Sequence, residues 1–272
     1  MSSDLEREVQ WYPGHMVQTT RKLKEFLRVI DIVVEVVDAR IPRSGRNPLL
    51  DELAARRARV VALDRDDLAD PEITRRWIDD LSRRGCSPVA VDGRKPRSVG
   101  RVAALIAQAP ARGGGAAKVS RAMIVGLPNS GKSTIVNALL RRSAAKTEDR
   151  AGVTRQLQWF RLAPTVELMD TPGVLTPKIR GAAAQWKLAL CGAVPRSRYD
   201  PAEVVGAFHD WLLGRRPSTT VPDLHGFAAA RGFVRRGAEV DYHNAAQSYI
   251  RAFNDGVFGR ISLEAPDDGE AA

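Results

Sequence analysis

One segment constrains the fold of this 272-residue chain more than any other. Residues 126–133 read GLPNSGKS and match the pattern G-x-x-x-x-G-K-[ST] of a phosphate-binding loop. The apolar residues 122–126 before it predict a strand, and a helix with apolar residues on one face is predicted to begin at Lys132. Strand–loop–helix units of this kind belong to parallel sheets, so we expect an α/β protein.

The surrounding sequence repeats the same alternation of helices and strands. Apolar periodicity predicts helices over residues 17–30, 47–58, 71–84 and 98–108, strands over 32–37, 60–63 and 88–91, and a hairpin over 157–162 and 165–170. Strands that alternate with helices of this length favour a doubly wound, mostly parallel sheet with helices on both faces.

The predicted strands end before residue 181, and the remaining patterns are helical. We therefore predict an α/β domain over residues 1–178, with a flexible Gly-rich joint near 110–118, and a C-terminal all-helical domain over 179–262. Residues 263–272 are rich in acidic side chains and are expected to form a disordered tail.

Composition excludes several classes of protein. The chain has 42 Lys+Arg and 32 Asp+Glu, a net charge of 42 − 32 = +10, which favours a polyanionic partner unless it reflects coding bias alone. Its two cysteines are too few for a disulfide scaffold or a four-cysteine zinc site. No apolar run approaches the roughly 20 residues of a membrane helix. We expect a cytoplasmic monomer with no membrane partner.

The phosphate loop predicts where nucleotide phosphates bind. Its glycines let successive backbone N–H groups turn onto phosphate oxygens at a helix N-terminus. Lys132 is expected to reach the β- and γ-phosphates as a catalytic residue, and the Ser133 hydroxyl is expected to bind Mg²⁺. Phosphate contacts are predicted for Ser130, Gly131, Lys132, Ser133 and Thr134.

Two further segments fit the same phosphate and metal site. Asp170-Thr171-Pro172-Gly173 ends a predicted strand, where Asp170 can hold the Mg²⁺ shell and the N–H of Gly173 can meet the γ-phosphate. Thr154, within Gly152-Val153-Thr154, can complete the Mg²⁺ ligands through its hydroxyl.

A base-recognition segment precedes the phosphate loop. Residues 63–68, LDRDDL, align with the pattern L-N-K-x-D-L of GTPases, so Asp67 is the predicted acceptor for guanine N1–H and N2–H₂. Asp64 takes the place of the usual Asn, and Arg65 takes the place of the usual Lys. The second base-binding loop has only a weak candidate, residues 91–93. This motif order (G4-G5-G1-G2-G3) is that of a circularly permuted P-loop GTPase domain.

The motifs and their order resemble the YlqF/RbgA family of circularly permuted GTPases, bacterial factors for assembly of the large ribosomal subunit with mitochondrial relatives. The resemblance is carried by residues 11–16 (WYPGHM), 38–42 (DARIP), 46–48 (RNP), 126–133, 152–155 (GVTR), 158–159 (QW) and 170–174 (DTPGV). It implies GTP and GDP as ligands, and the large-subunit precursor with its rRNA as partner. It also implies hydrolysis stimulated by the ribosome and a small C-terminal helical domain.

The resemblance also implies roles for two side chains. Val174 stands where Ras-like proteins carry a water-orienting glutamine, and the family's His, here His15, has been proposed to help hydrolysis instead. The alternative for His15 is a turn residue that caps the sheet or touches RNA. Asn129 matches the residue that coordinates K⁺ in related GTPases, although Asn also simply favours this turn.

Two other functions stay open at this point. Asp64 would place an acceptor opposite the guanine N7 acceptor, which favours an ATP-using P-loop enzyme with altered base selection. Val174 and the basic composition favour a nucleotide-sensing RNA- or ribosome-binding protein with negligible turnover. Competition by ADP tests the first alternative, and ribosome-stimulated phosphate release tests the second.

Overall fold

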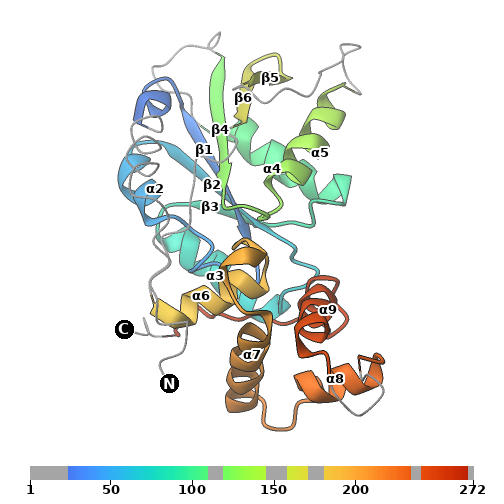
Figure 1. Ribbon diagram of the computed structural model, residues 1–272. Coiled ribbons are helices and arrows are strands. Elements are labelled where there is room, and N and C mark those ends of the chain that lie inside the picture. The colour runs from blue at the N-terminus through green and yellow to red at the C-terminus, as the bar shows by residue number, and fades with distance from the viewer. Residues whose placement is uncertain (1–23, 110–118, 145–157, 171–180, 234–239, 269–272) are drawn as a thin grey trace.

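The computed structural model describes residues 24–109, 119–144, 158–170, 181–233 and 240–268 (Figure 1). Six strands form one sheet in the order β3-β2-β1-β4-β6-β5. Every pairing is parallel except that of β5 with β6, which is the predicted hairpin. The strands are β1 (Ile32–Asp38), β2 (Ala58–Asp64), β3 (Ser87–Ala90), β4 (Ser120–Gly126), β5 (Gln158–Ala163) and β6 (Val166–Asp170).

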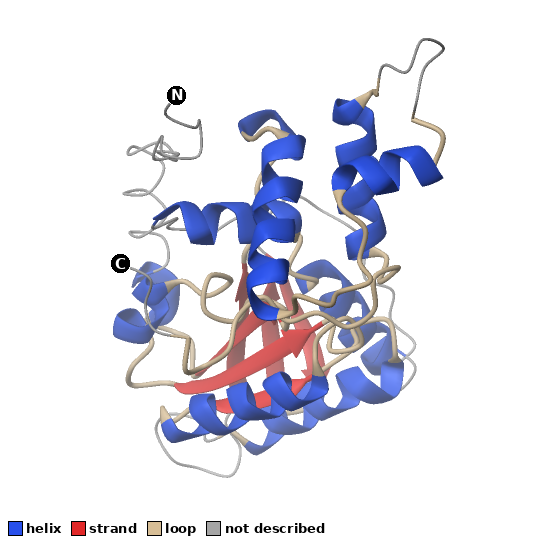
Figure 2. Cartoon of the chain, turned by 90° about the horizontal axis from the view of Figure 1, so that it is seen from below, coloured by secondary structure: helices blue, strands red, loops and turns tan. Residues whose placement is uncertain are grey.

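Helices cover both faces of this sheet (Figure 2). Residues that alternate along a strand face opposite sides, so Val34 and Val36 pack with one set of helices and Val37 with the other. The first face packs against α4 (Pro96–Gln108) and α5 (Lys132–Ala144), and the second packs against α3 (Pro71–Arg83). The doubly wound α/β architecture is therefore confirmed.

Two predicted helices differ from the structure. The helix predicted over 47–58 is the short α2 (Pro48–Leu53), because Ala58 already pairs with Ile32 in the ladder between β2 and β1. Residues 54–57 form the turn between α2 and β2, and the sheet takes Ala58. The helix predicted over 17–30 is described only from residue 24 and is helical through Leu27.

The described residues from 181 onward form helices and no β-strand. They comprise α6 (Gly181–Leu190), a 3₁₀ turn η2 (Arg196–Arg198), α7 (Pro201–Arg215), α8 (Leu224–Ala230) and α9 (Tyr242–Asn254). Aromatic rings join these helices: Phe208 of α7 packs edge-on against Phe253 of α9 at 5.3 Å, and Phe227 of α8 against Tyr249 at 4.9 Å. Within the described residues, no helix has the length and apolar character to cross a bilayer.

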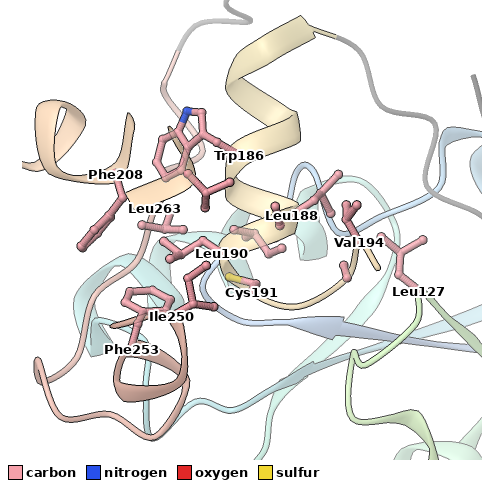
Figure 3. Close-up of a cluster of buried hydrophobic side chains, with 14 of the residues drawn as sticks. Leu127, Trp186, Leu188, Leu190, Cys191, Val194, Phe208, Ile250, Phe253 and Leu263 are labelled. Atoms are coloured by element: carbon pink, nitrogen blue, oxygen red, sulfur yellow. The ribbon is translucent and has the colours of Figure 1, made fainter. Parts of the chain in front are cut away.

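The helical region and the sheet share one continuous core (Figure 3). Leu127 of the phosphate loop packs in the same cluster as Leu188, Cys191 and Val194 from α6 and the turn after it. Phe208 of α7 belongs to the same cluster. Because this apolar surface is buried jointly, the helices help to stabilise the loop on which nucleotide binding depends.

The disorder predicted from residue 263 is wrong for the described residues 263–268. Ile261 N–H donates to Leu68 O at 2.9 Å, and Leu263 N–H donates to Arg40 O at 2.8 Å. The segment thus runs against the loops that follow β1 and β2, and Leu263 is fully buried. The prediction of disorder was based on the acidic composition of this segment. It failed because the residues that bind Glu264 are distant in the sequence, and composition does not reveal them.

The Glu264 carboxylate is the polar anchor of this C-terminal segment. It is 2% exposed and accepts hydrogen bonds from the backbone N–H groups of Arg43 at 2.8 Å and Ser44 at 3.0 Å, and from the Ser44 hydroxyl. Lys187 Nζ of α6 lies 3.6 Å away. Buried charges of this kind are tolerated only when donors surround them.

We expect Glu264→Ala to lower the free energy of unfolding by about 2–3 kcal/mol, because it leaves buried N–H donors without an acceptor. Asp267→Ala is the matched control. Asp267 is 71% exposed and pairs with Arg76, and a surface pair contributes at most about 1 kcal/mol. Urea unfolding of both variants tests the difference, and equal losses would contradict the anchoring role.

Candidate functional site

The predicted site residues that the structure describes lie at the carboxyl edge of the parallel sheet. The phosphate loop follows β4, Asp170 ends β6, Asp38 ends β1 and Asp64 ends β2. Crevices at this edge are where open α/β sheets bind ligands.

Steric demands fix the glycines of the phosphate loop. Gly131 adopts φ 93°, and a Cβ there would lie 1.7 Å from Asp64 Oδ2. At Gly126 a Cβ would lie 2.6 Å from the Ser130 hydroxyl. Asn129 also has positive φ, 58°, so the loop contains two residues in the left-handed region, a backbone conformation that favours concave arrangements of N–H groups. This is the geometry expected for binding phosphate.

The loop's polar side chains fit a phosphate and a hard cation. The Ser130 hydroxyl is buried and has no hydrogen-bond partner among the described residues, so it is available to a ligand. Lys132 Nζ lies 3.4 Å from Asp170 Oδ1, which brings the predicted phosphate-binding amine and the predicted Mg²⁺ carboxylate together. Ser133 is exposed at the start of α5. Hydroxyl and carboxylate oxygens are the ligands that Mg²⁺ prefers.

Asp64 joins the base-recognition segment to its neighbouring loops. Its carboxylate is buried, accepts a 2.8 Å hydrogen bond from Gly93 N–H, and abuts Gly131 of the phosphate loop. The structure thus brings residues 91–93, the weak candidate for the second base loop, against the first. Burial raises the pKa of Asp64 to about 6, although the backbone N–H groups of Gly93 and Arg65 oppose the rise.

We expect Asp64→Asn to stabilise the protein at pH 7.5. With its pKa raised from 3.8, Asp64 holds its proton longer in the folded than in the unfolded chain. Stability therefore falls as pH rises through this window, by up to about 3 kcal/mol. The asparagine variant lacks that loss, so its advantage in urea unfolding should grow from pH 4.5 to pH 7.5. A pH-independent difference would contradict this, and Asp79→Asn, an exposed residue of α3, is the control.

Arg65 connects the base-recognition segment to the phosphate loop. It adopts φ 61°, and its guanidinium donates to the carbonyl oxygen of Asn129 at 3.1 Å and to Asp38 Oδ2 at 3.3 Å. Burial alone would raise the pKa of Asp38, but the guanidinium groups of Arg40 and Arg65 outweigh it and hold that pKa below its usual value. A lysine has a single ammonium group in place of the planar guanidinium fork, so it could not make both of these contacts.

Residues of the helical region reach the same site and were not predicted from the sequence. Asn254 of α9 accepts from Arg65 at 3.2 Å and from Arg40 at 2.9 Å. The Asn129 amide donates to the carbonyl oxygen of Gly192, after α6, at 2.7 Å. No local pattern could have revealed these contacts, since their partners are far apart in the chain. Because the amide nitrogen of Asn129 is engaged, its side-chain oxygen is the atom suited to a cation.

Asp67, the predicted guanine acceptor, lies beside Arg94. The Arg94 guanidinium pairs with Asp67 Oδ2, and Asp67 Oδ1 is buried without a hydrogen-bond partner in the described chain. Arg94 directly follows the second base loop, so its position was a usable signal that sequence analysis passed over.

Four residues to which the sequence assigned or denied a role lie outside the described residues. They are His15, Thr154, Gly173 and Val174. Their predicted roles in hydrolysis, Mg²⁺ binding and γ-phosphate contact therefore remain predictions.

Comparisons with known proteins agree with this site. A family model described as "50S ribosome-binding GTPase" matches residues 121–194, which contain the phosphate loop. Ribosome biogenesis GTPase A of Priestia megaterium is 33% identical, over 96% of this chain and 98% of its own length. Mitochondrial ribosome-associated GTPase 1 of Mus musculus is 37% identical, over 94% and 90% respectively.

A solved structure extends the agreement to the whole fold. The crystal structure of GNP-bound YlqF from Thermotoga maritima has a TM-score of 0.73 and 27% sequence identity, and the match covers 92% of this chain and 99% of that one. Sequence and fold agree along nearly the full length. The chain therefore belongs to the ribosome biogenesis GTPase A (YlqF/RbgA) family of circularly permuted GTPases.

Proposed function

We propose that this GTPase acts in the cytoplasm, as a monomer, on the precursor of the large ribosomal subunit, and that the ribosomal particle stimulates its hydrolysis of GTP. The observation that carries the nucleotide part is the hydrogen bond from Arg65 to the carbonyl oxygen of Asn129, which spans 64 residues of sequence. It holds the base-recognition segment and the phosphate loop at one sheet edge, as a single nucleotide site requires. Family membership and the net charge of +10 support a partner rich in RNA phosphates.

In this proposal, each predicted site residue has a definite task. Lys132 and the loop N–H groups bind the phosphates, and Asp67 accepts hydrogen bonds from guanine. Ser133, Thr154 and Asp170 would hold Mg²⁺, and Asn129 would hold K⁺; when bound, both ions would supply positive charge against the phosphates. His15 positions the attacking water, because Val174 cannot.

The test is phosphate release from GTP under single-turnover conditions, with and without purified large-subunit precursors, in K⁺ and Mg²⁺ buffer. We expect slow release alone and at least tenfold faster release with the particle. With ATP in place of GTP, we expect neither the slow phosphate release nor the faster release with the particle. Equal rates with both nucleotides would support the ATP-using alternative, and unchanged release with the particle would support a binding protein with negligible turnover.

A further inference from the structure

An arginine from the neighbouring loop holds the carboxylate that is proposed to read guanine. The Arg94 guanidinium pairs with Asp67 Oδ2, while its Nε donates to Asp92 Oδ1 at 3.1 Å. The backbone N–H of Arg94 donates to the same Asp92 oxygen at 3.0 Å. Asp92 is 3% exposed and Arg94 is 70% exposed, so the arginine is anchored at its base and has an accessible fork.

This arrangement leaves Asp67 able to accept further hydrogen bonds. Its Oδ1 has no partner among the described residues, and a carboxylate oxygen such as Oδ2 can accept a second donor beside Arg94. The ion pair therefore leaves lone pairs of Asp67 for guanine N1–H and N2–H₂, and binding of the base must first uncover Oδ1, which is buried. Arg94, Gly93 and Thr134 also line a pocket against α5.

The chemistry of the purine edge then distinguishes two bases. In guanine the acceptor O6 is adjacent to N1–H, so a cation bonded to the carboxylate oxygen that takes N1–H lies beside O6. Recognition of this kind therefore requires Asp67 Oδ2, the oxygen paired with Arg94, to take N1–H, and Oδ1 to take the 2-amino group. Adenine carries an amino group in place of O6, and an amino group facing a guanidinium places donor against donor.

We propose that Arg94 is a specificity-determining residue that donates to guanine O6 and disfavours adenine. The inference rests on the proposed guanine-reading role of Asp67. It also accounts for Asp64, whose carboxylate is directed at Gly93 and Gly131 and supplies no amide donor to the base. The donor that the altered segment lacks would face guanine N7, and Arg94 supplies a donor to the neighbouring acceptor O6 instead.

The test measures displacement of a fluorescent GDP analogue by GDP, IDP and ADP from the wild type, Arg94→Ala and Arg97→Ala. IDP keeps O6 and N1–H but lacks the 2-amino group. We expect Arg94→Ala to weaken GDP and IDP equally, by about tenfold or more, and to leave ADP unchanged or tighter. Arg97 is exposed on α4, so its variant corrects for the lost positive charge.

Every other pattern overturns the inference. Tighter GDP binding by Arg94→Ala would show that the arginine merely competes with the base for Asp67. Equal weakening of all three nucleotides beyond the Arg97 control would show a general role in loop structure. A wild type that binds GDP and ADP equally would instead refute the proposed guanine recognition itself. Thermal unfolding checks that both variants are folded.

Discussion

Replacing Lys132 with alanine is expected to abolish GTP hydrolysis while leaving the protein folded. The ammonium group is the proposed partner of the β- and γ-phosphates, and removing one preorganised donor to a developing charge costs about a hundred- to a thousandfold in rate. The Lys132 side chain is 13% exposed and contacts Asp170, at 28% exposed, so the variant loses a partly solvated contact rather than core packing.

The measurement is single-turnover phosphate release, with nucleotide affinity determined in parallel. Lys24→Ala removes an equal charge from an exposed position and should hydrolyse GTP like the wild type. Release by Lys132→Ala within tenfold of the wild type would exclude the proposed catalytic role.

Asp67→Asn is expected to change the preferred base from guanine to xanthine. A carboxylate accepts from both N1–H and N2–H₂, whereas an amide offers one acceptor and one donor, which match N1–H and O2 of xanthine. Because the guanine amino group then faces another donor, GDP affinity should fall by a hundredfold or more, equivalent to about 2.7 kcal/mol.

Displacement of a fluorescent nucleotide by GDP and XDP measures this exchange. Asp66→Asn removes one negative charge from the same loop and should keep the guanine preference. Loss of GDP binding without any gain for XDP would mean that Asp67 supports the loop rather than reads the base.

Much of the fold can be predicted from the pattern of apolar residues over short stretches of the sequence. The apolar stretch before residue 126 and the helix after Lys132 predicted the central strand–loop–helix unit, and alternation elsewhere predicted a doubly wound sheet. These signals are local because burial of a strand or a helix face imposes a period on neighbouring residues. The steric requirement at Gly131 is likewise visible in the phosphate-loop pattern.

Contacts between residues far apart in the sequence could not be predicted from local sequence patterns. Asn254 reaches Arg65 across 189 residues, and Glu264 reaches Arg43 across 221. An acidic segment has the same composition whether it is solvated or bound to buried N–H donors, so the tail was mispredicted. The part played by Asp64 similarly depends on Gly93 and Gly131, which only the folded chain brings to it.

The strand order has a consequence for how the chain folds during translation. β1 lies between β2 and β4, yet β4 begins only at Ser120, after three strands have already been synthesised. During translation the amino-terminal half emerges with one edge of its central strand unpaired, and with the face of Val33 awaiting helices from residue 181 onward. Unpaired edges of this kind promote association with other chains. We expect chaperones to bind nascent chains that are arrested before β4. Release of the chain from the chaperone should require synthesis of nearly the whole sequence.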